Sequence, residues 1–483
     1  MACSVKLKRK SLFAVVLALV LIFMTGGLVM AQVPDTVRVG IITPNEGSLC
    51  RNATAVSFMV KGNYQVIDMS SPIPGDNLIG APREGDSWQV YYLPTGMQIY
   101  QNGQPLKITS GPIVVKEVYH GSGNRVALVN YNVGTAITDI GSNYRGNMEF
   151  RLSGSSLTAV NELPTEEYLY GVVPREMSNS WPLEALKAQA VAARTYTVAN
   201  FSKRAAEGFN MLDTKYDQAY GGINVEGENA SQAVRETAGQ VILYNSAPIR
   251  AVYHSNSGGH TEDNENVWTG PAFAYLRGKD DIYSTKNGYA NWSITTTIDD
   301  VRNKLLQSGS QIGPIVSFQL EKYPSGRVKN VMITDITGNN IVISGTVFGQ
   351  MFNPKFYTTI GNASFMSNFF DIEMDNVINP SFSVINDSGK IGNVAGSQLY
   401  GVSEGGTVAV LNGSDNIFFV QGEQGKSSFN KDLTGMIVFQ GHGWGHGVGM
   451  SQWGAYQMAK EGKGHLEILK FYYTGVDVTN SNQ

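Results

Sequence analysis

The sequence predicts a strand-rich α+β protein with one long buried helix, a few shorter helices and peripheral β-rich regions. Short runs rich in Val, Ile, Tyr and Phe alternate with turn residues over much of the chain, which is typical of strands. One long segment that follows Pro182 has helical periodicity and is apolar on nearly every side, which indicates a buried helix. A hydrophobic content of 42% in 483 residues is enough to form several packed cores.

The amino-terminal segment predicts export. A basic run over residues 6–10 precedes an apolar run over residues 11–24, and two glycines then interrupt the run before the small residues Val29 and Ala31. This is the layout of a secretory signal peptide that is cleaved after Ala31, while an uncleaved membrane anchor has a similar composition. We therefore expect residues 1–31 to be a signal peptide or a membrane anchor.

Charge and cysteine content exclude several classes of protein. The whole chain has a net charge of −4, and the part after residue 31 has −8, with 32 cationic against 40 anionic side chains. A nucleic-acid partner is therefore not expected, because such proteins are usually basic. Two cysteines cannot form a disulfide-rich scaffold or a four-cysteine metal site.

Changes in composition divide the exported part into four regions. Residues 36–160 form a β-rich region with runs such as VRVGIIT, WQVYYL and NMEFRL, and residues 161–292 contain the helices of the expected core. Residues 293–440 are mostly strand-like, with turns such as PSGR, and are expected to be an insertion. Residues 441–478, rich in Gly and His and then helical, would complete the core.

Three helices and two strands are expected within residues 161–292. Thr165 can cap a short helix of sequence EEYLYGVV, and Pro182 fits the first turn of a long helix that continues to about Glu207. A third helix is predicted from Glu228 to about Glu236, before Gly239, and the strands QVILYN and IRAVYHS follow.

Two cations lie in the middle of an apolar face of the long helix. Lys187 and Arg194 are about two turns, or ~10 Å, apart on that face. Buried cations need partners. Either both side chains reach the surface or meet structural carboxylates, or they line a polar groove and hold a catalytic carboxylate or a substrate oxygen.

A glutamate in the loop before this helix is a candidate general acid. Glu176 has apolar or neutral neighbours, including Val173 and Met177, apart from Arg175. Apolar surroundings disfavour a charged carboxylate, as a general acid requires, whereas a cation within reach opposes this effect.

Four of the six histidines lie in the segments HSNSGGHTE and GHGWGHG, which begin at His254 and Gly441. A metal site at these histidines is disfavoured, because the segments lack the glutamate of a helical zinc motif. A serine nucleophile is also disfavoured, because the segments lack the strand–turn–helix elbow that such a serine occupies. Glycine turns with histidines bound to the backbone remain an alternative, as does a binding cleft in which glycines let the chain approach a ligand. The polar candidates for such a cleft are His254, Ser257, His442, His446 and Gln452.

Four blocks of sequence together resemble one family. They are LTAVNELPTEEYLYGVVPREMSNSWPLEALKAQAVAARTY, DTKYDQAYGG, AVYHSNSGGHTED and GHGWGHGVGMSQWGA, and they resemble the stage II sporulation protein D and amidase-enhancer family. The resemblance implies a lytic transglycosylase that cuts the glycan strands of peptidoglycan, or a relative that promotes the activity of a cell-wall amidase.

The resemblance also implies roles for particular residues. Glu176 would be the catalytic residue, and Lys187 and Arg194 would be functional residues of the cleft. Candidate contacts with the sugar are Gln218, Tyr220, His254, His442 and His446. Some relatives hold zinc at positions that correspond here to Leu212, Tyr216 and Asp217, so we expect neither a metal nor another cofactor.

We therefore expect an exported enzyme, extracellular or associated with the cell wall, that cleaves peptidoglycan glycan strands at Glu176. Two non-enzymatic alternatives stay open. In one, the same cleft binds glycan or a cell-wall amidase and enhances the partner's activity; in the other, the chain is a wall-binding module with a structural glutamate. Contact with a membrane is expected only through an uncleaved anchor in residues 11–31.

Overall fold

The computed structural model describes residues 32–480, apart from 45–48, 51, 72–76, 288–289, 353–364, 375–380, 386–390, 396–399, 403–407, 411–416, 423–424 and 431–435. For residues 49–50 and 381–430 it describes strand pairing without side chains. The predicted signal peptide or anchor, residues 1–31, lies outside the described residues. The chain forms two compact units: unit 1 comprises the residues up to Ala251 and those from Gly475 onward, and unit 2 comprises Val252–Thr474.

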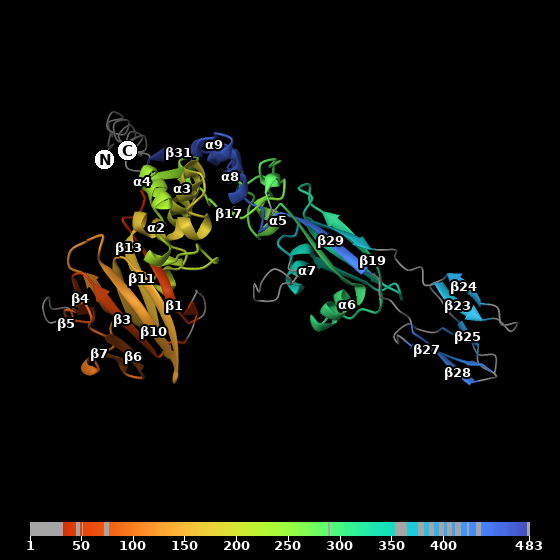
Figure 1. Cartoon of the computed structure of the whole chain (residues 1–483), viewed down its shortest axis with the longest axis horizontal. Coiled ribbons are helices and arrows are strands. Elements are labelled where there is room, and N and C mark those ends of the chain that lie inside the picture. The colour runs from red at the N-terminus through yellow and green to blue at the C-terminus, as the bar shows by residue number, and fades with distance from the viewer. Residues whose placement is uncertain are drawn as a thin grey trace, which may run out of the picture. The chain divides into compact units, whose positions relative to one another are not determined.

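Unit 1 begins with a sandwich of two sheets that pack face to face (Figure 1). The larger sheet has the order β14 (Met211–Leu212), β1 (Thr36–Thr43), β13 (Ser156–Pro164), β12 (Asn147–Ser153), β9 (Ile113–Glu117), β4 (Tyr64–Asp68) and β5 (Leu78–Gly80), with β2 (Leu49–Cys50) beside β1. The smaller sheet has the order β11 (Ala136–Tyr144), β10 (Arg125–Val133), β3 (Ala55–Lys61), β6 (Trp88–Leu93), β7 (Gly96–Gln101) and β8 (Gln104–Thr109).

Aromatic rings join the two sheets of this sandwich. Phe58 on β3 stacks on Phe150 on β12 with ring centroids 5.3 Å apart, and Trp88 on β6 is 6.1 Å from Phe58. All three side chains are fully buried because successive strand residues alternate between the core and the outer face. The β-rich character predicted for this region is confirmed.

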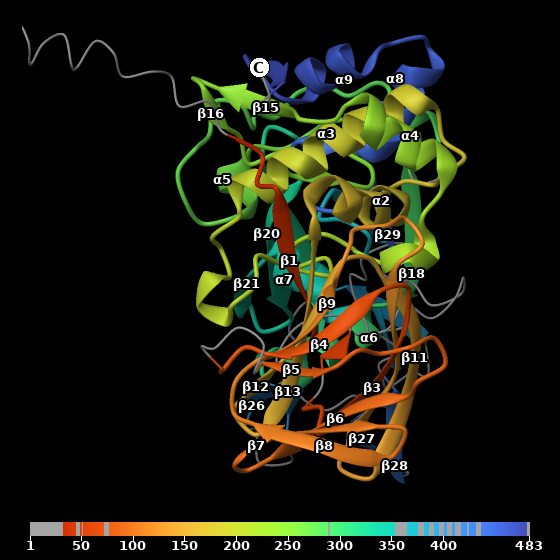
Figure 2. The same cartoon turned by 90° about the vertical axis from the view of Figure 1, so that its left-hand side faces the viewer.

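Besides the sandwich, unit 1 contains a layer of helices with a small sheet (Figure 2). α3 (Leu183–Ala199) packs against α2 (Thr165–Glu176), α4 (Glu228–Glu236) and β15 (Gln240–Tyr244). The small sheet has the order β16 (Ala247–Pro248), β15 and β31 (Asp477–Asn480), and the connections contain two single-turn helices, η1 (Ala205–Glu207) and η2 (Gly222–Val225).

The predicted helices of unit 1 are confirmed, with two differences in detail. α3 is buried as expected but ends at Ala199 rather than near Glu207, and the chain turns there because Asn210 donates a hydrogen bond of 2.8 Å to the Phe201 carbonyl. Thr165 does not cap α2. It is the first residue of the helix, and its hydroxyl instead donates to the Pro34 carbonyl on the neighbouring chain segment.

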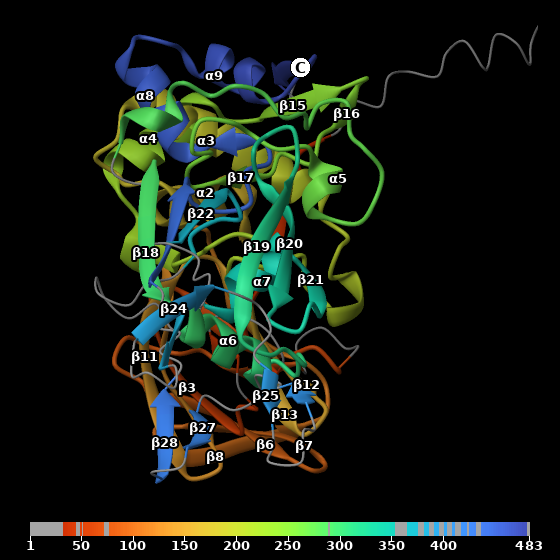
Figure 3. The same ribbon diagram turned by 90° about the vertical axis from the view of Figure 1, so that its right-hand side faces the viewer.

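Unit 2 contains two three-stranded antiparallel sheets that surround a phenylalanine-rich core (Figure 3). One has the order β18 (Asn291–Thr297), β29 (Met436–His442) and β22 (Phe370–Met374), and the other β19 (Ile315–Lys322), β20 (Val328–Asp335) and β21 (Asn340–Ser344). The helices α6 (Ile298–Gln307) and α7 (Gly345–Met351), which the sequence did not predict, cover this core. β18 and β29 cross the expected borders of the insertion at residues 293 and 440.

The rest of unit 2 contains the histidine segments. β17 (Tyr253–His254) runs parallel to β30 (Met450–Ser451), and α5 (Asn264–Val267), η3 (Ser284–Lys286), α8 (Gln452–Lys460) and α9 (His465–Tyr472) surround them. Three hairpins are formed by β23 (Ser381–Ile385) and β24 (Ile391–Ala395), β25 (Tyr400–Val402) and β26 (Val408–Val410), and β27 (Ile417–Gly422) and β28 (Gly425–Asn430). No helix in the described part of the chain has both the length and the apolarity to cross a membrane.

Gly171 lets α2 pack closely against the segment that contains Tyr220 and Gly222. A Cβ atom at this position would lie 2.6 Å from the Tyr220 ring and 3.1 Å from the Gly222 carbonyl oxygen. We expect Gly171→Ala to lower the free energy of unfolding by about 1–3 kcal/mol, because overpacking displaces Tyr220. Urea unfolding measures the change. The matched control is Gly123→Ala, where a Cβ would meet no atom within 4 Å; equal stability of the two variants would contradict the packing argument.

Candidate functional site

Glu176 is the last residue of α2, and a backbone amide holds its carboxylate. The side chain is half-buried, and its Oε1 accepts a hydrogen bond of 3.0 Å from the Ala219 N–H. The negative end of the helix dipole opposes a carboxylate here, whereas the N–H favours it. The Ala219 N–H therefore fixes the direction of the Glu176 carboxyl group.

Gln218 anchors the segment that presents this amide. Its Oε1 accepts hydrogen bonds from Tyr168 Oη at 3.2 Å and Thr197 Oγ1 at 2.9 Å, and its Nε2 donates to the Ala193 carbonyl at 3.2 Å. The residue is only 1% exposed. Predicted as a sugar contact, Gln218 is enclosed between α2 and α3, where it fixes the position of Ala219.

Tyr220 anchors the same segment from its other side. Its hydroxyl donates to Asn161 Oδ1 at 2.9 Å, and its ring lies 5.1 Å from the ring of Tyr168. Burial raises the pKa of Tyr220 well above its usual value, so the hydroxyl stays protonated. The contacts of Tyr220, like those of Gln218, are those of a positioning residue.

Arg194 is fully buried and joins three elements. Its Nε and Nη2 donate to the two carboxylate oxygens of Glu166 on α2 at 2.8 and 2.6 Å. Nη2 also reaches the Val234 carbonyl on α4 at 3.4 Å, and Nη1 reaches the Gln240 carbonyl on β15 at 3.2 Å. The carboxylate that Arg194 holds is thus Glu166 and not Glu176, as in the structural alternative for this cation.

Lys187 lies at the edge of the same helical layer. Its Nζ is 2.7 Å from Glu184 Oε1 one turn earlier and 2.7 Å from Glu236 Oε2 on α4. Burial lowers the pKa of Lys187, but the hydrogen bonds with Glu184 and Glu236 outweigh it and raise the pKa overall. Lys187 is therefore a charged tie between α3 and α4.

Ion pairs close the loop for which the family resemblance implies zinc ligands in some relatives. Asp217, whose side chain is fully buried, contacts Lys203 Nζ and accepts hydrogen bonds from Arg204 Nε at 2.6 Å and from the Leu212 N–H at 2.9 Å. Among the residues described, no three His, Cys, Asp or Glu side chains come close enough together to hold a metal ion. The donors of this loop do not fit zinc, because Leu212 offers no ligand atom and Asp217 is engaged with cations.

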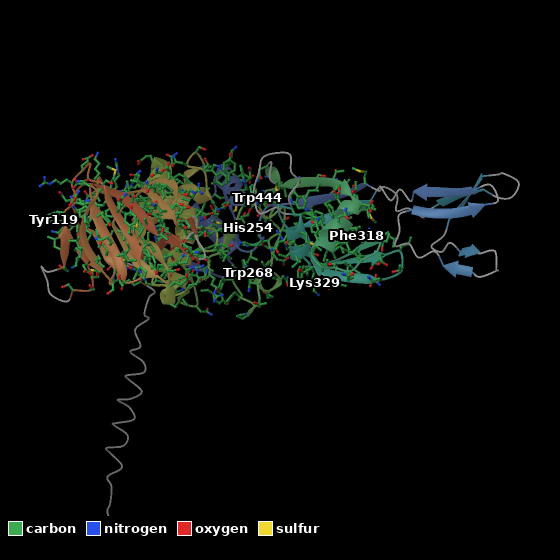
Figure 4. The ribbon with its side chains drawn as sticks, turned by 90° about the horizontal axis from the view of Figure 1, so that it is seen from below. Tyr119, His254, Trp268, Phe318, Lys329 and Trp444 are labelled. Atoms are coloured by element: carbon green, nitrogen blue, oxygen red, sulfur yellow. The ribbon has the colours of Figure 1, made fainter. Side chains whose placement is uncertain are left out.

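In unit 2, the buried His254 and the half-buried His446 lie beside each other. Their ring centroids are 5.3 Å apart, and the Trp268 ring lies 4.8 Å from that of His446. Figure 4 shows His254 and Trp268 in this part of the unit. His254 Nδ1 donates to the Val448 carbonyl at 3.0 Å, and its buried Nε2 has no hydrogen-bond partner among the described residues.

Burial keeps both imidazoles neutral. It lowers the pKa of His446 to about 4 and the pKa of His254 well below the usual value. His446 is bound to the backbone at both nitrogens, since Nε2 donates to the Tyr253 carbonyl at 3.0 Å and Nδ1 accepts from the Val448 N–H at 3.1 Å. The contacts of His446 match the structural alternative in which the backbone satisfies the histidines, whereas His254 is satisfied at Nδ1 alone among the described residues.

The remaining candidates of unit 2 have different surroundings. Ser257 is fully buried, and its hydroxyl donates to Asp281 Oδ2 at 2.6 Å. His442 is half-buried with Nδ1 2.7 Å from Asn291 Oδ1, and Gln452 is the first residue of α8 and 7% exposed. His442 and Gln452 stay candidate ligand contacts, while the Ser257 hydroxyl serves the interior.

Sequence reasoning missed a buried cation beneath the glycine-rich segment. Arg327, in the PSGR turn, is fully buried and donates to the carbonyls of His260 at 2.7 Å and Ser257 at 2.8 Å. A Cβ on Gly447, which has φ +82°, would lie 2.4 Å from its guanidinium carbon. Nothing in the local sequence of a turn distinguishes this arginine from a solvated one. The requirement for glycine at position 447 is thus explained.

Comparisons with known proteins match these observations to one family. A family model described as Stage II sporulation protein matches residues 153–244. The chain is 30% identical over 345 residues to an uncharacterized protein of Brachyspira hyodysenteriae, covering 71% of this chain and 74% of that protein. It is 32% identical over 394 residues to the amidase enhancer of Bacillus subtilis and 28% identical over 342 residues to stage II sporulation protein D of the same organism.

The chain belongs to the stage II sporulation protein D and amidase-enhancer family. These alignments cover 78% of the chain and 50% of the amidase enhancer, and 67% of the chain and 77% of stage II sporulation protein D. The chain thus spans only half the length of the amidase enhancer. The matched residues 153–244 of this family member contain Glu176, Lys187, Arg194, Gln218 and Tyr220, all in unit 1.

The two helix cations of this family member should differ in their effect on stability. We expect Arg194→Gln to lower the free energy of unfolding by about 3 kcal/mol, because it leaves Glu166 and two carbonyls without their donor. Lys187→Gln, as the matched variant, should cost less than about 1 kcal/mol, since its partners Glu184 and Glu236 are partly exposed. Urea unfolding of both variants measures the difference, and losses of equal size would contradict a structural role for Arg194.

Acid should destabilise the protein through its buried histidines. An unfolded histidine binds a proton below about pH 6.5, whereas folded His446 does so only near pH 4, so stability falls as the pH drops between these values. We expect His446 alone to account for a loss on the order of 2 kcal/mol. His446→Gln, which retains a donor and an acceptor, should flatten the dependence of the melting temperature on pH. An unchanged slope in this variant would contradict the assignment.

Proposed function

We propose that the protein is a lytic transglycosylase of peptidoglycan glycan strands, with Glu176 as its catalytic residue. The observation that carries the proposal is the half-buried Glu176 carboxylate, oriented by the Ala219 N–H at 3.0 Å. Gln218 and Tyr220 on either side of Ala219 are locked by buried hydrogen bonds, so the donor itself is preorganised. A catalytic group held in this way loses little freedom when the substrate binds.

One carboxyl group can perform the whole reaction. The protonated Glu176 donates its proton to the glycosidic oxygen while the bond from that oxygen to the muramyl C1 breaks. The resulting carboxylate then takes the proton of the C6 hydroxyl of the same sugar, and the C6 oxygen bonds to C1. The products are a shortened strand and a 1,6-anhydro end, no water is consumed, and Glu176 regains its proton.

The surroundings of Glu176 support a mechanism with a single carboxylate. Ordinary glycosidases use two carboxyl groups on either side of the bond. The buried Asp217, two residues before Ala219, is paired with Lys203 and Arg204 and so is not available as a base. The proposal assigns Lys187 and Arg194 a positioning role, because both hold other carboxylates in the helical layer that carries Glu176.

The test is digestion of purified glycan strands by wild type and Glu176→Gln, followed by mass spectrometry of the products. We expect 1,6-anhydro ends from wild type and a rate lower by about 10²–10⁴-fold in the variant, because the amide cannot transfer the proton. Glu228→Gln, at a side chain that is 79% exposed, removes the same charge and should leave the rate unchanged. Equal rates for wild type and Glu176→Gln would disprove the assignment.

The second candidate function is enhancement of a cell-wall amidase. It is favoured by the 32% identity to a relative named amidase enhancer. In this function the protein is exported, binds glycan strands or the amidase, and cleaves nothing itself. Wild type that releases no 1,6-anhydro ends but accelerates a purified amidase would replace the first proposal by this one.

A further inference from the structure

Unit 1 has a pocket at the end of its larger sheet that the proposed function does not use. The cavity has a volume of about 430 Å³ and lies between the ends of β1, β12 and β13 and the turn that contains η1. Its polar lining includes Thr43, Arg151 and Glu207, and its walls include Gly208 and Phe209. A volume of this size suits a small organic ligand. None of the residues that hold Glu176 lines it.

Arg151 is the cation of this pocket, and among the described residues it forms one long ion pair. The guanidinium makes no hydrogen bond with any residue that the structure describes, and its nearest carboxylate, Glu149 Oε1, is 3.8 Å away. Glu149 is instead bound by Arg38 at 2.9 Å. Burial, and also Arg38, lowers the pKa of Arg151, which remains a cation because its usual value is so high. An incoming anion would supply the hydrogen bonds that this half-buried group lacks.

Thr43 is a second polar residue in the lining of the pocket. Thr43 is 3% exposed, and its Oγ1 has no hydrogen-bond partner among the described residues. Thr43 and Arg151 come from different strands, yet both line the same cavity.

Position 208, next to Arg151, can be occupied only by glycine. Gly208 has φ +79°, and a Cβ at this position would lie 1.7 Å from Arg151 Nη1. The flat guanidinium thus lies directly on the backbone, with the buried ring of Phe209 beside it in the pocket wall. This contact restricts the guanidinium and leaves its fork for planar recognition of a ligand.

The charges around the pocket select the kind of anion. Glu207 lines the same cavity, and its carboxylate is 49% exposed although Oε1 is 3.0 Å from Arg204 Nη1. A phosphate dianion would lie beside the Glu207 carboxylate, and Arg151 would be the one cation of the pocket lining to balance its two charges. A carboxylate fits the fork with one charge, and an amide or ammonium group next to it would donate to Glu207.

We propose that this pocket binds the carboxyl-terminal end of a short peptide, with the terminal carboxylate on Arg151 and the adjacent N–H donor directed to Glu207. The Phe209 wall would pack against a small apolar side chain of that peptide. The site does not involve Glu176 or glycan cleavage. The peptide-binding proposal can therefore be tested separately from the proposed function.

The experiment is calorimetric titration of the full chain with three probes: the dipeptide alanyl-alanine, its carboxyl-terminal amide and inorganic phosphate. The dipeptide should bind at millimolar or lower concentration, and the amide and phosphate should bind at least tenfold more weakly. This comparison needs no variant, so it is valid whatever happens to a mutant. Equal binding of the dipeptide and its amide, stronger binding of phosphate, or no binding of the dipeptide would each overturn the proposal.

Variants of Arg151 then test its role in dipeptide binding. Arg151→Gln should weaken dipeptide binding at least tenfold, and Arg151→Lys should recover part of it, because the charge remains but the fork is lost. Arg125→Gln is the matched control, since this exposed arginine lies on β10 outside the pocket lining. Glu176→Gln should bind the dipeptide like wild type, which separates this site from the catalytic proposal. A folded Arg151→Gln protein with unchanged affinity would exclude the site.

Discussion

The ion pair between the fully buried Arg194 and the half-buried Glu166 is the interaction on which the helical layer of unit 1 depends. It connects the first turn of α2 to the middle of α3, and the same guanidinium satisfies carbonyls at the end of α4 and the start of β15. An ion pair of this kind stabilises little compared with apolar packing, but it is costly to break because each partner is left without its counterion. It therefore specifies the arrangement of the helices. With the start of α2 fixed against α3, the position of Glu176 at its far end follows from the length of the helix.

A second set of constraints acts on the segment that faces Glu176. Gln218 and Tyr220 fix it through hydrogen bonds, and Asp217 closes its loop through Lys203 and Arg204. Zinc in some relatives, as the resemblance implies, would bind the same loop by coordination. Either kind of interaction can tie two chain segments together across a short loop. In this protein the ion pairs of Asp217 do so. These ion pairs and hydrogen bonds keep the Ala219 N–H of this protein in place.

The sequence was sufficient for the elements whose signals are local. The alternating strands of unit 1, the helix Glu228–Glu236 and the burial of α3 all follow from periodicity. The choice of Glu176 as the catalytic candidate came from its motif and stays a prediction. The side chains that these residues contact could not be identified from the sequence. Periodicity shows that Arg194 is buried, but it cannot choose between Glu166 and Glu176, because that choice depends on how α2 crosses α3. The end of α3 also depends on a distant contact, since Asn210 holds the turn that follows it.

The same limit explains the histidines and the source of binding affinity. Composition offered His254 and His446 as cleft residues, whereas their burial beside Arg327 keeps them neutral, since burial and nearby positive charge both oppose protonation. They therefore add no positive charge to a chain whose net charge after residue 31 is −8. Long-range attraction cannot bring such a protein to an anionic polymer. Under the two proposals above, recognition depends on short-range groups with fixed geometry: the oriented carboxyl of Glu176 and the guanidinium of Arg151, whose nearest carboxylate is 3.8 Å away.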